Sequence, residues 1–124
     1  MNSSAEYNRK WRKLNPDKVN AQNRRYREKY PDKDKANRRR YGIKLRTDAV
    51  SQLGGICVHC GIKDIRVLTI DHVNGNGSSQ RKLMSSSTVY RKIRDVEIDL
   101  CLFQVLCWNC NFLKYLEKDK EKGY

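Results

Sequence analysis

The chain has 124 residues and carries 27 Lys and Arg against 14 Asp and Glu, a formal net charge of +13. Only 38% of its residues are hydrophobic, too few to enclose a large apolar pocket, and the basic excess favours a polyanionic partner such as nucleic acid. No apolar run approaches the roughly 20 residues of a membrane span, and the first residues lack the apolar core of a secretory signal. We therefore expect a cytoplasmic protein, in which five cysteines favour metal binding over disulfides.

The positive charge is concentrated in the first third of the chain. Residues 1–46 contain 16 basic and 5 acidic residues, a net charge of +11, whereas residues 47–124 have a net charge of only +2. All five cysteines and both histidines lie in the second segment. This distribution predicts two modules, a basic arm over 1–46 and a domain over 47–124 that carries the chemistry.

The basic arm contains an internal repeat. The sequence Asn-Arg-Lys-Trp-Arg at 8–12 returns as Asn-Arg-Arg-Tyr-Arg at 23–27 and in part at 38–41. Leu14 and Val19 are the only large aliphatic residues between 8 and 40, so one interpretation is a solvated, disordered tail. The fixed aromatic spacing favours the other interpretation, an arm that becomes ordered on double-stranded DNA. The residues expected to contact DNA are Arg9, Lys10, Trp11, Arg12, Arg24, Arg25, Tyr26, Arg27, Arg38, Arg39, Arg40 and Tyr41.

The same arm is expected to be helical. Pro-Asp-Lys occurs at both 16–18 and 31–33, and proline suits the first turn of a helix, with Asp beside it facing the positive end of the helix dipole. Asn15 is a favourable cap before the first of these prolines. We therefore predict helices near 16–29 and 31–41, with a kink at the second proline.

The second module is expected to be a small α+β domain. In chain order, its first elements are a helix over 46–55 capped by Thr47 and stopped at Gly54, a cysteine knuckle over 57–61, a strand over 65–73 and Asn-Gly turns over 74–77. A polar loop over 78–87, a helix over 88–95 capped by Ser87, a strand over 102–106 and a final helix with the apolar stripe Phe112, Leu113 and Leu116 follow.

Four of the cysteines have the spacing of a zinc site. Cys57 and Cys60 form one Cys-x-x-Cys pair, and Cys107 and Cys110 form a second. Two such pairs supply the four thiolates of a tetrahedral structural zinc site, an interpretation we favour over buried or reactive thiols. The remaining cysteine, Cys101, lies in an apolar run and is predicted to be a small buried thiol. His59 lies within the first pair and is predicted to be an exposed bystander, because four thiolates already complete the site.

A second group of polar residues is expected beside the cysteines. Asp71 and His72 end the first predicted strand, and Asn111 directly follows the second cysteine pair. The zinc would bring these segments together. A carboxylate and an amide oxygen suit Mg²⁺ or Mn²⁺, and a neighbouring histidine that is not a ligand can act as a general base. The alternative is that Asp71 caps a turn and His72 packs in the core.

These motifs resemble those of the HNH endonucleases. The runs that carry the resemblance are Leu-Thr-Ile-Asp-His-Val-Asn-Gly at 68–75 and Gln-Val-Leu-Cys-Trp-Asn-Cys-Asn-Phe-Leu-Lys at 104–114, and the similarity extends over about 47–118. They look most like the zinc-stabilised branch found in phage-encoded, homing-type nucleases. The resemblance implies a ββα-metal fold in which two strands and a helix clasp one catalytic cation, and a DNA-hydrolysing activity that leaves 5′-phosphate and 3′-hydroxyl ends.

The resemblance also implies residue roles. His72 would be the general base, Asp71 and Asn111 the ligands of a catalytic Mg²⁺ or Mn²⁺, and the four paired cysteines the ligands of a structural zinc. Asn74 or Asn76 would orient the histidine, with Asn74 preferred.

Basic residues of the second module are candidates for phosphate contacts around the scissile bond. They are Arg81, Lys82, Arg91, Lys92, Arg94 and Lys114. No heptad or apolar patch predicts a dimer, so we expect a monomer in solution. Two other functions compete with the nuclease: a non-catalytic zinc-ribbon DNA-binding regulator and an RNA-binding zinc protein with the same arm.

Overall fold

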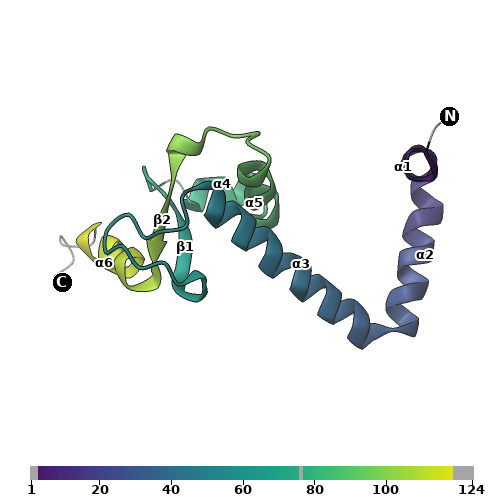
Figure 1. Ribbon diagram of the computed structural model, residues 1–124, viewed down its shortest axis with the longest axis horizontal. Helices are drawn as coiled ribbons and strands as arrows, with labels where there is room; N and C mark the ends of the chain where they lie inside the picture. Colours follow the sequence, from purple (N-terminus) through teal and green to yellow (C-terminus); the bar gives the residue numbers. More distant parts are fainter. Residues whose placement is uncertain (1–2, 76, 119–124) are drawn as a thin grey trace. The chain divides into compact units, whose positions relative to one another are not determined.

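The computed structural model describes residues 3–75 and 77–118 (Figure 1). The chain divides into two compact units, one ending at Arg40 and the other beginning at Tyr41. The predicted boundary after residue 46 therefore lies a few residues further along the same helix. No helix in the described ranges is both long enough and apolar enough to cross a membrane.

The first unit consists of helices without a buried core. Helix α1 spans Ser4–Leu14, α2 spans Pro16–Lys29, and Pro31 begins α3. Neither α1 nor α2 contains a buried residue, in line with the shortage of aliphatic side chains. The prolines begin two helices as predicted, and Tyr30 separates them with a non-helical backbone, at φ of −131° and ψ of 61°. Helix α1 was not predicted from the sequence.

Asn15 does not have the predicted capping role. It occupies the position before α2, but its side chain makes no capping hydrogen bond to that helix. Instead its Nδ2 donates to the carbonyl of Trp11 at 2.8 Å and satisfies the end of α1. This amide group therefore pairs with a C-terminal carbonyl of the preceding helix, which has no partner within the helix.

Helix α3 is longer than predicted. It spans Pro31–Gln52 without interruption and joins two segments that we expected to be separate helices. Thr47 is not a cap: its Oγ1 donates to the carbonyl of Ile43 at 2.8 Å, inside the helix. Gly42 alone does not break the helix, since glycine costs only about 1 kcal/mol there. The predicted stop is close to correct, because Gly54 follows the helix with φ of 105°.

The sheet of the second unit has two antiparallel strands. Strand β1 spans Leu68–His72 and β2 spans Phe103–Cys107, with Leu68 opposite Cys107 and His72 opposite Phe103. Short 3₁₀ helices precede them, η1 (Ile65–Val67) and η2 (Leu100–Leu102). Both strands fall within or close to the predicted segments. The fold class is thus an α-rich domain with a two-stranded sheet.

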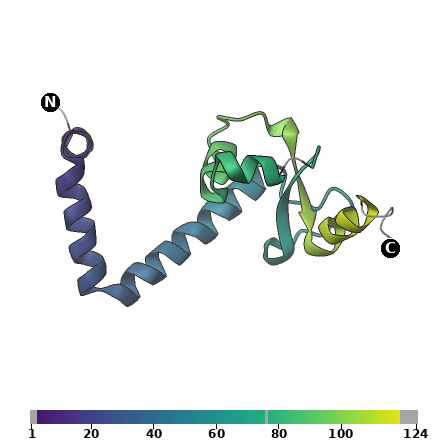
Figure 2. The ribbon, with the colours of Figure 1, turned by 180° about the vertical axis from the view of Figure 1, so that it is seen from behind.

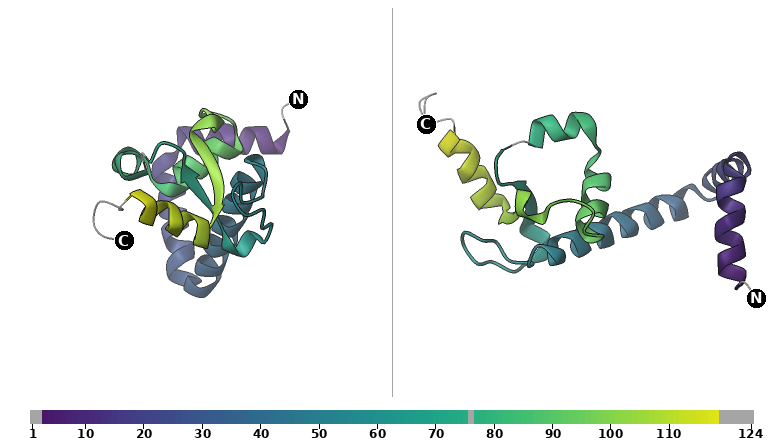
Figure 3. Two further views of the ribbon diagram at one scale, coloured as in Figure 1. Left: turned by 90° about the vertical axis from the view of Figure 1, so that its left-hand side faces the viewer. Right: turned by 90° about the horizontal axis from the view of Figure 1, so that it is seen from above.

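Three further helices complete this unit. Helices α4 (Gly77–Leu83) and α5 (Ser86–Arg94) follow one another, and α6 (Trp108–Lys118) continues directly from β2 (Figure 3). Within this unit, α6 lies on one side of the sheet and the α4–α5 pair on the other (Figures 1 and 2). The ends of α6 and α4 can therefore both approach the end of β1.

The predicted loop over 78–87 is wrong, because most of it is helix α4. The predicted cap of α5 is also displaced. Ser85, not Ser87, precedes that helix, and its Oγ accepts from the backbone N–H of Thr88 at 3.3 Å. Because serines occupy 85–87, the sequence permits α5 to begin after either Ser85 or Ser87. The helix begins after Ser85, and it buries Val89 and Ile93 against the core.

The core of the second unit consists of two small clusters. One combines Val50, Leu68, Val105 and Leu106 with three cysteines, and the other combines Ala49, Val89, Ile93 and Phe103. The C-terminal turns of α3 contribute to both. The arrangement places the cysteines inside the principal apolar cluster instead of at its margin.

Two burial predictions are wrong. Cys101 is exposed, because it lies in η2 and not in β2. The predicted apolar stripe of α6 is also largely in contact with solvent, since Phe112 and Leu113 are 59% and 45% exposed. The residue that α6 buries is Cys110, so this helix is anchored chiefly through its first turn.

Candidate metal centre and adjoining polar cavity

The four paired cysteines come together from two segments far apart in the sequence. Cys57 and Cys60 lie in a turn whose backbone closes through Gly61, which has φ of 79° and donates to the carbonyl of Cys57 at 2.9 Å. Cys107 is the last residue of β2, and Cys110 lies in the first turn of α6. The backbone N–H of Val58 donates to Val105 at 3.0 Å, so the turn is attached to β2 directly.

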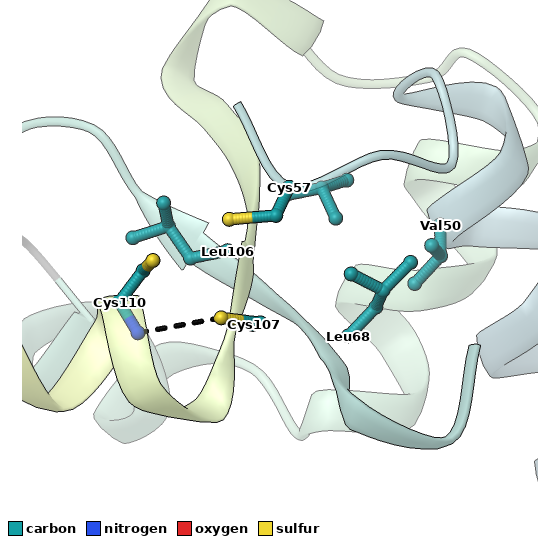
Figure 4. Close-up of a cluster of buried hydrophobic side chains, with 7 residues drawn as sticks. Val50, Cys57, Leu68, Leu106, Cys107 and Cys110 are labelled. Atoms are coloured by element: carbon teal, nitrogen blue, oxygen red, sulfur yellow. Dashed lines mark hydrogen bonds between the residues drawn. The ribbon is translucent and has the colours of Figure 1, made fainter. Parts of the chain in front are cut away.

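The geometry of the thiols fits a single metal ion. All four Sγ atoms lie within 4.8 Å of one another, and those of Cys60 and Cys107 are 3.7 Å apart. A tetrahedral zinc with Zn–S bonds of about 2.3 Å has S–S edges of about 3.8 Å. Figure 4 shows the sulfurs of Cys57, Cys107 and Cys110 facing a common space beside Leu106. Together, the four cysteines are close enough to bind a metal ion such as zinc.

The thiols differ in how readily they ionise. Burial raises the pKa of Cys57, but hydrogen bonds from backbone amides outweigh it and lower the pKa to about 6. Burial, together with hydrogen bonds to neighbouring thiols, raises the pKa of Cys110 to about 12. A full set of four thiolates in this space therefore requires compensating positive charge.

His59 is exposed, as expected, but it is not remote from the cluster. Its Nδ1 lies 3.5 Å from Cys110 Sγ, within reach of an N–H···S hydrogen bond. Four thiols are enough to complete a tetrahedral zinc site without this imidazole. We therefore describe His59 as a potential hydrogen-bond donor to the sulfur of Cys110 and not as a fifth ligand.

A polar cavity opens at the His72 end of β1, the end opposite to Leu68, which pairs with Cys107. Its volume is about 390 Å³, and its walls come from β1, α4, α5 and α6. Asp71, His72 and Asn111 all line it. His72 and Asn111 are far apart in the sequence but lie close together, because β2 pairs with β1 and continues directly into α6.

Asp71 is held by two donors. Its Oδ2 accepts from Gln104 Nε2 at 2.9 Å, across the strand pair, and from Lys114 Nζ at 2.5 Å. The Lys114 ammonium also donates to the carbonyl of His72 at 2.9 Å. The carboxylate therefore already has a cation beside it, supplied by α6.

His72 lies between an aromatic ring and an amide. Its ring centroid is 5.0 Å from that of Phe103, with the two planes inclined by 59°. Its Nε2 contacts Oε1 of Gln80, which lies on α4. The imidazole is consequently held on one side by the core and on another by α4.

Asn111 is oriented by a short chain of hydrogen bonds. Its Nδ2 donates to Thr69 Oγ1 at 3.1 Å, and Thr69 in turn donates to the carbonyl of Leu106 at 2.8 Å. With the amide nitrogen engaged, the Oδ1 atom is the part of this side chain that can serve as a ligand. Sequence reasoning did not identify Thr69.

Of the two asparagines expected to orient the histidine, the structure describes only Asn74. Asn74 is exposed in the turn after β1 and does not line the cavity, and Asn76 lies outside the described residues. Gln80 contacts His72 instead. Sequence reasoning missed Gln80 because it assigned this segment to a loop. Recognising α4 would have placed Gln80 on the first helical turn after the Asn-Gly turn.

The expected phosphate-binding residues are divided. Arg81 and Lys114 line the cavity, together with Lys118, which was not predicted. Arg94 is half-buried and forms an ion pair with Asp95 at 2.8 Å. Lys82 and Arg91 are exposed and Lys92 is half-buried; none of these three lines the cavity.

The predicted DNA-contacting side chains of the arm are exposed on α1, α2 and the first half of α3. Tyr26 packs on Tyr30, with ring centroids 5.3 Å apart. Lys10 and Arg38 form i,i+4 ion pairs with Glu6 and Asp34 along their own helices. Within the first unit, most of the basic side chains are therefore exposed, where a polyanion could contact them.

Comparison with known proteins adds no relative: no family model matches the chain, and no curated protein and no solved structure is significantly similar to it.

Proposed function

We propose that this protein is a metal-dependent DNA endonuclease of the HNH type, stabilised by a zinc ion. The observation that carries the proposal is that Asp71, His72 and Asn111 line one cavity, at the end of a strand pair whose other end leads into the cysteine cluster. A carboxylate, an imidazole and an amide gathered in this way suit phosphodiester hydrolysis. The resemblance of the flanking sequence runs to HNH nucleases points in the same direction.

The cysteine cluster would hold structural zinc. Four thiols leave no position for a substrate or water, which is typical of a structural site and not of a catalytic one. Because three of the four cysteines belong to the principal core cluster, metal binding and folding of this unit would be coupled.

Asp71 and Asn111 would hold the catalytic cation. One carboxylate and one amide oxygen form a hard-donor set that suits Mg²⁺ or Mn²⁺, ions that retain several waters and bind substrate phosphate. The cation would supply Lewis-acid stabilisation of charge at the scissile phosphate. Asn111 is preoriented for this role by Thr69, and Asp71 by Gln104.

His72 would act on water. Its neutral imidazole takes a proton as the water oxygen forms a bond to phosphorus in line with the leaving 3′ oxygen. The P–O3′ bond breaks and the 3′ oxygen acquires a proton from solvent. One product strand then ends in a 3′-hydroxyl, and the other begins with a 5′-phosphate. The cations that line the cavity, Arg81, Lys114 and Lys118, would attract the phosphate backbone.

A plasmid-nicking assay with Mg²⁺ or Mn²⁺ tests the proposal. The wild-type chain should convert supercoiled plasmid to the open circle, and EDTA should stop the reaction. His72→Ala should abolish nicking while DNA affinity, measured by fluorescence anisotropy, stays close to that of the wild type. Equal nicking by both proteins would exclude His72 as the base.

A non-catalytic zinc-containing DNA-binding protein is the second candidate. The observation that favours it is the pairing of Asp71 with the Lys114 ammonium, which neutralises the carboxylate without a divalent cation. Under this alternative, the wild-type chain binds DNA but does not nick plasmid in the presence of either cation. The nicking assay therefore separates the two functions.

A further inference from the structure

Three aromatic side chains are exposed on one side of α6. Trp108, Phe112 and Tyr115 are 67%, 59% and 58% exposed, although side chains of this size usually bury most of their surface. At about 100° per residue, their directions around the helix axis fall within about 60° of one another. Helix α6 lies on the other side of the sheet from α4 and α5 (Figure 1). We call these three side chains the aromatic face.

The rings of the aromatic face are suited to stacking. The ring centroids of Phe112 and Tyr115 are 6.1 Å apart, and their planes are inclined by only 21°. Seven residues of helix rise by about 10 Å, which is the length of about three nucleotides at 3.4 Å each. Aromatic side chains are rigid, so a second planar group can stack on them at a low cost in side-chain entropy.

The aromatic face borders the polar cavity. Tyr115 belongs to both, because it also lines the cavity. Asn111, Lys114 and Lys118 line the cavity as well, and they project about 40–100° from Tyr115 around the helix axis. One strip of α6 therefore carries aromatic rings, and the adjoining strip carries two lysines.

The charges beside the aromatic face favour a polyanion as its partner. The cavity is lined by Arg81 in addition to the two lysines, and its one carboxylate, Asp71, is paired with Lys114. Within Trp108–Lys118, the one acidic residue is Glu117, which projects about 180° from Trp108. The aromatic face thus lies next to cations and away from the acidic side of its own helix.

Aromatic rings next to cations are typical of surfaces that bind single-stranded nucleic acid. Bases stack on the rings, and the cations follow the phosphate backbone. In an intact duplex each base is covered by its neighbours in the stack, so its faces cannot reach a ring on the protein surface. The chemistry of this face therefore suits an unpaired strand.

We propose that the aromatic face of α6 binds an unpaired DNA strand beside the scissile phosphate. Nucleobases stack on Trp108, Phe112 and Tyr115, and the phosphates lie toward the cations of the cavity. This inference rests on the proposed nuclease function and deepens it, because it names the substrate class: DNA that contains an unpaired stretch at the site of cleavage.

The ratio of two DNA affinities tests the proposal. Fluorescein-labelled oligo(dT) and a duplex of the same length are titrated with the full-length chain without Mg²⁺ or Mn²⁺, so that neither probe is cut, and anisotropy measures binding. Because the basic arm can contact the phosphates of either probe, the ratio isolates base stacking. Phe112→Ala should lower the affinity for oligo(dT) relative to the duplex by roughly fivefold to 150-fold, the equivalent of about 1–3 kcal/mol for one stacked base.

Three further variants define what the ring contributes. Leu113→Ala is the matched control and should leave the ratio unchanged, because Leu113 is 45% exposed on the same helix but projects about 140° from Trp108. Phe112→Tyr keeps a ring and should keep the ratio, whereas Phe112→Leu keeps apolar bulk without a ring and should lose it. Zinc content and circular dichroism confirm that each variant is folded. A wild-type ratio in Phe112→Leu would overturn the proposal.

Trp108 provides a direct signal. Trp11 and Trp108 are the two tryptophans of the chain, so Trp11→Phe leaves the emission of Trp108 alone. In this variant, oligo(dT) should quench the fluorescence, because a base stacks on the indole, and the duplex should not. Unchanged emission at saturating oligo(dT) would contradict stacking on this residue.

Two other results would overturn the proposal in favour of a different partner. Equal loss of affinity for both probes in Phe112→Ala would mean that the ring inserts between the base pairs of a duplex. Dimerisation of the wild type in sedimentation velocity, abolished by Phe112→Ala but not by Leu113→Ala, would mean that a second copy of the chain covers the aromatic face.

These measurements separate failure of this inference from failure of the proposed function, because none of them requires cleavage. If the wild type does not nick plasmid but the ratio and the quenching are as expected, the nuclease is excluded and the aromatic face still binds unpaired DNA. If the wild type nicks and Phe112→Ala has the wild-type ratio, the nuclease stands and the role of the aromatic face is wrong.

Discussion

At the residue scale, the cysteines differ in what each would contribute. Cys57 is fully buried within the principal core cluster, whereas Cys101 is exposed and is not one of the four clustered cysteines. Both are free thiols of the same chemical type. Comparing serine substitutions at the two positions therefore distinguishes the loss of a metal ligand from the effect of replacing any cysteine of this protein.

Cys57→Ser should lower the zinc content and the melting temperature. Structural zinc in small peptides binds with about 10–16 kcal/mol. Even a loss of about 3 kcal/mol would lower the Tm of a domain this size by roughly 12–24 °C. Atomic absorption and differential scanning calorimetry measure the two effects, with Cys101→Ser as the control. One equivalent of zinc in Cys57→Ser would exclude the four-thiolate site.

Lys114 is the other residue whose role a single substitution can define. Its ammonium would compete for the Asp71 carboxylate with any metal cation that binds there. The side chains of Lys114 and Asp71 are largely shielded from solvent, at 24% and 15% exposed. Lys114→Met should therefore tighten Mn²⁺ binding by roughly fivefold, corresponding to about 1 kcal/mol of competing interaction. Isothermal titration calorimetry measures this affinity, with the exposed Lys63→Met as control. Unchanged affinity would show that Lys114 does not compete for the carboxylate.

At the element scale, local sequence predicted the strands and α2 but not α4. Strand β1 is marked by branched aliphatic residues, and α2 by the proline that begins it. Helix α4 has seven residues, with glycine and serine at its start, and contains no buried residue, so no periodic pattern indicates it. Helix α3 was divided in the prediction because Thr47 resembles a cap, whereas burial of Ala49 and Val50 holds the helix together.

The same distinction applies to the candidate site. Asp71, His72 and Asn111 could be identified because they adjoin strong motifs, the end of a strand and a cysteine pair. Gln80 could not, because its contact with His72 depends on the direction in which α4 leaves the turn. The residues that would carry the chemistry were predictable, and a residue that positions them required the tertiary structure.

Helix α5 is expected to hold one side of the cavity. Ile93 is fully buried on α5 and belongs to the cluster that contains Phe103, the ring against which His72 packs. Ile93→Ala should lower the free energy of unfolding by about 2–5 kcal/mol. Leu83→Ala, at a position 83% exposed on α4, should change it by less than about 0.5 kcal/mol. Urea unfolding followed by circular dichroism compares the two; similar values would mean that α5 does not support the core.

At the scale of the whole molecule, charge and chemistry are separated along the chain. The first 46 residues carry +11 of the total charge of +13, and their helices bury no side chain before Leu45. The metal cluster and the cavity both belong to the unit from Tyr41 onwards. If the arm supplies the phosphate contacts, its contribution should appear in affinity and salt dependence but not in zinc content.

The salt dependence of DNA binding tests this division. About eight cations on phosphates would give a slope near −7 for log affinity against log salt concentration, at roughly 0.9 per contact. Replacing Arg24, Arg25 and Arg27 of α2 by glutamine should reduce that slope by about 2.7, because three exposed cations are removed.

Arg66 provides the control for this experiment. It is an exposed arginine of the second unit, and its guanidinium is paired with Asp64 at 2.6 Å. Arg66→Gln should leave the slope unchanged, because this cation is already neutralised and lies outside the arm. Fluorescence anisotropy over a series of salt concentrations measures both slopes. A triple variant with the wild-type slope would mean that these three arginines of α2 do not contact phosphate.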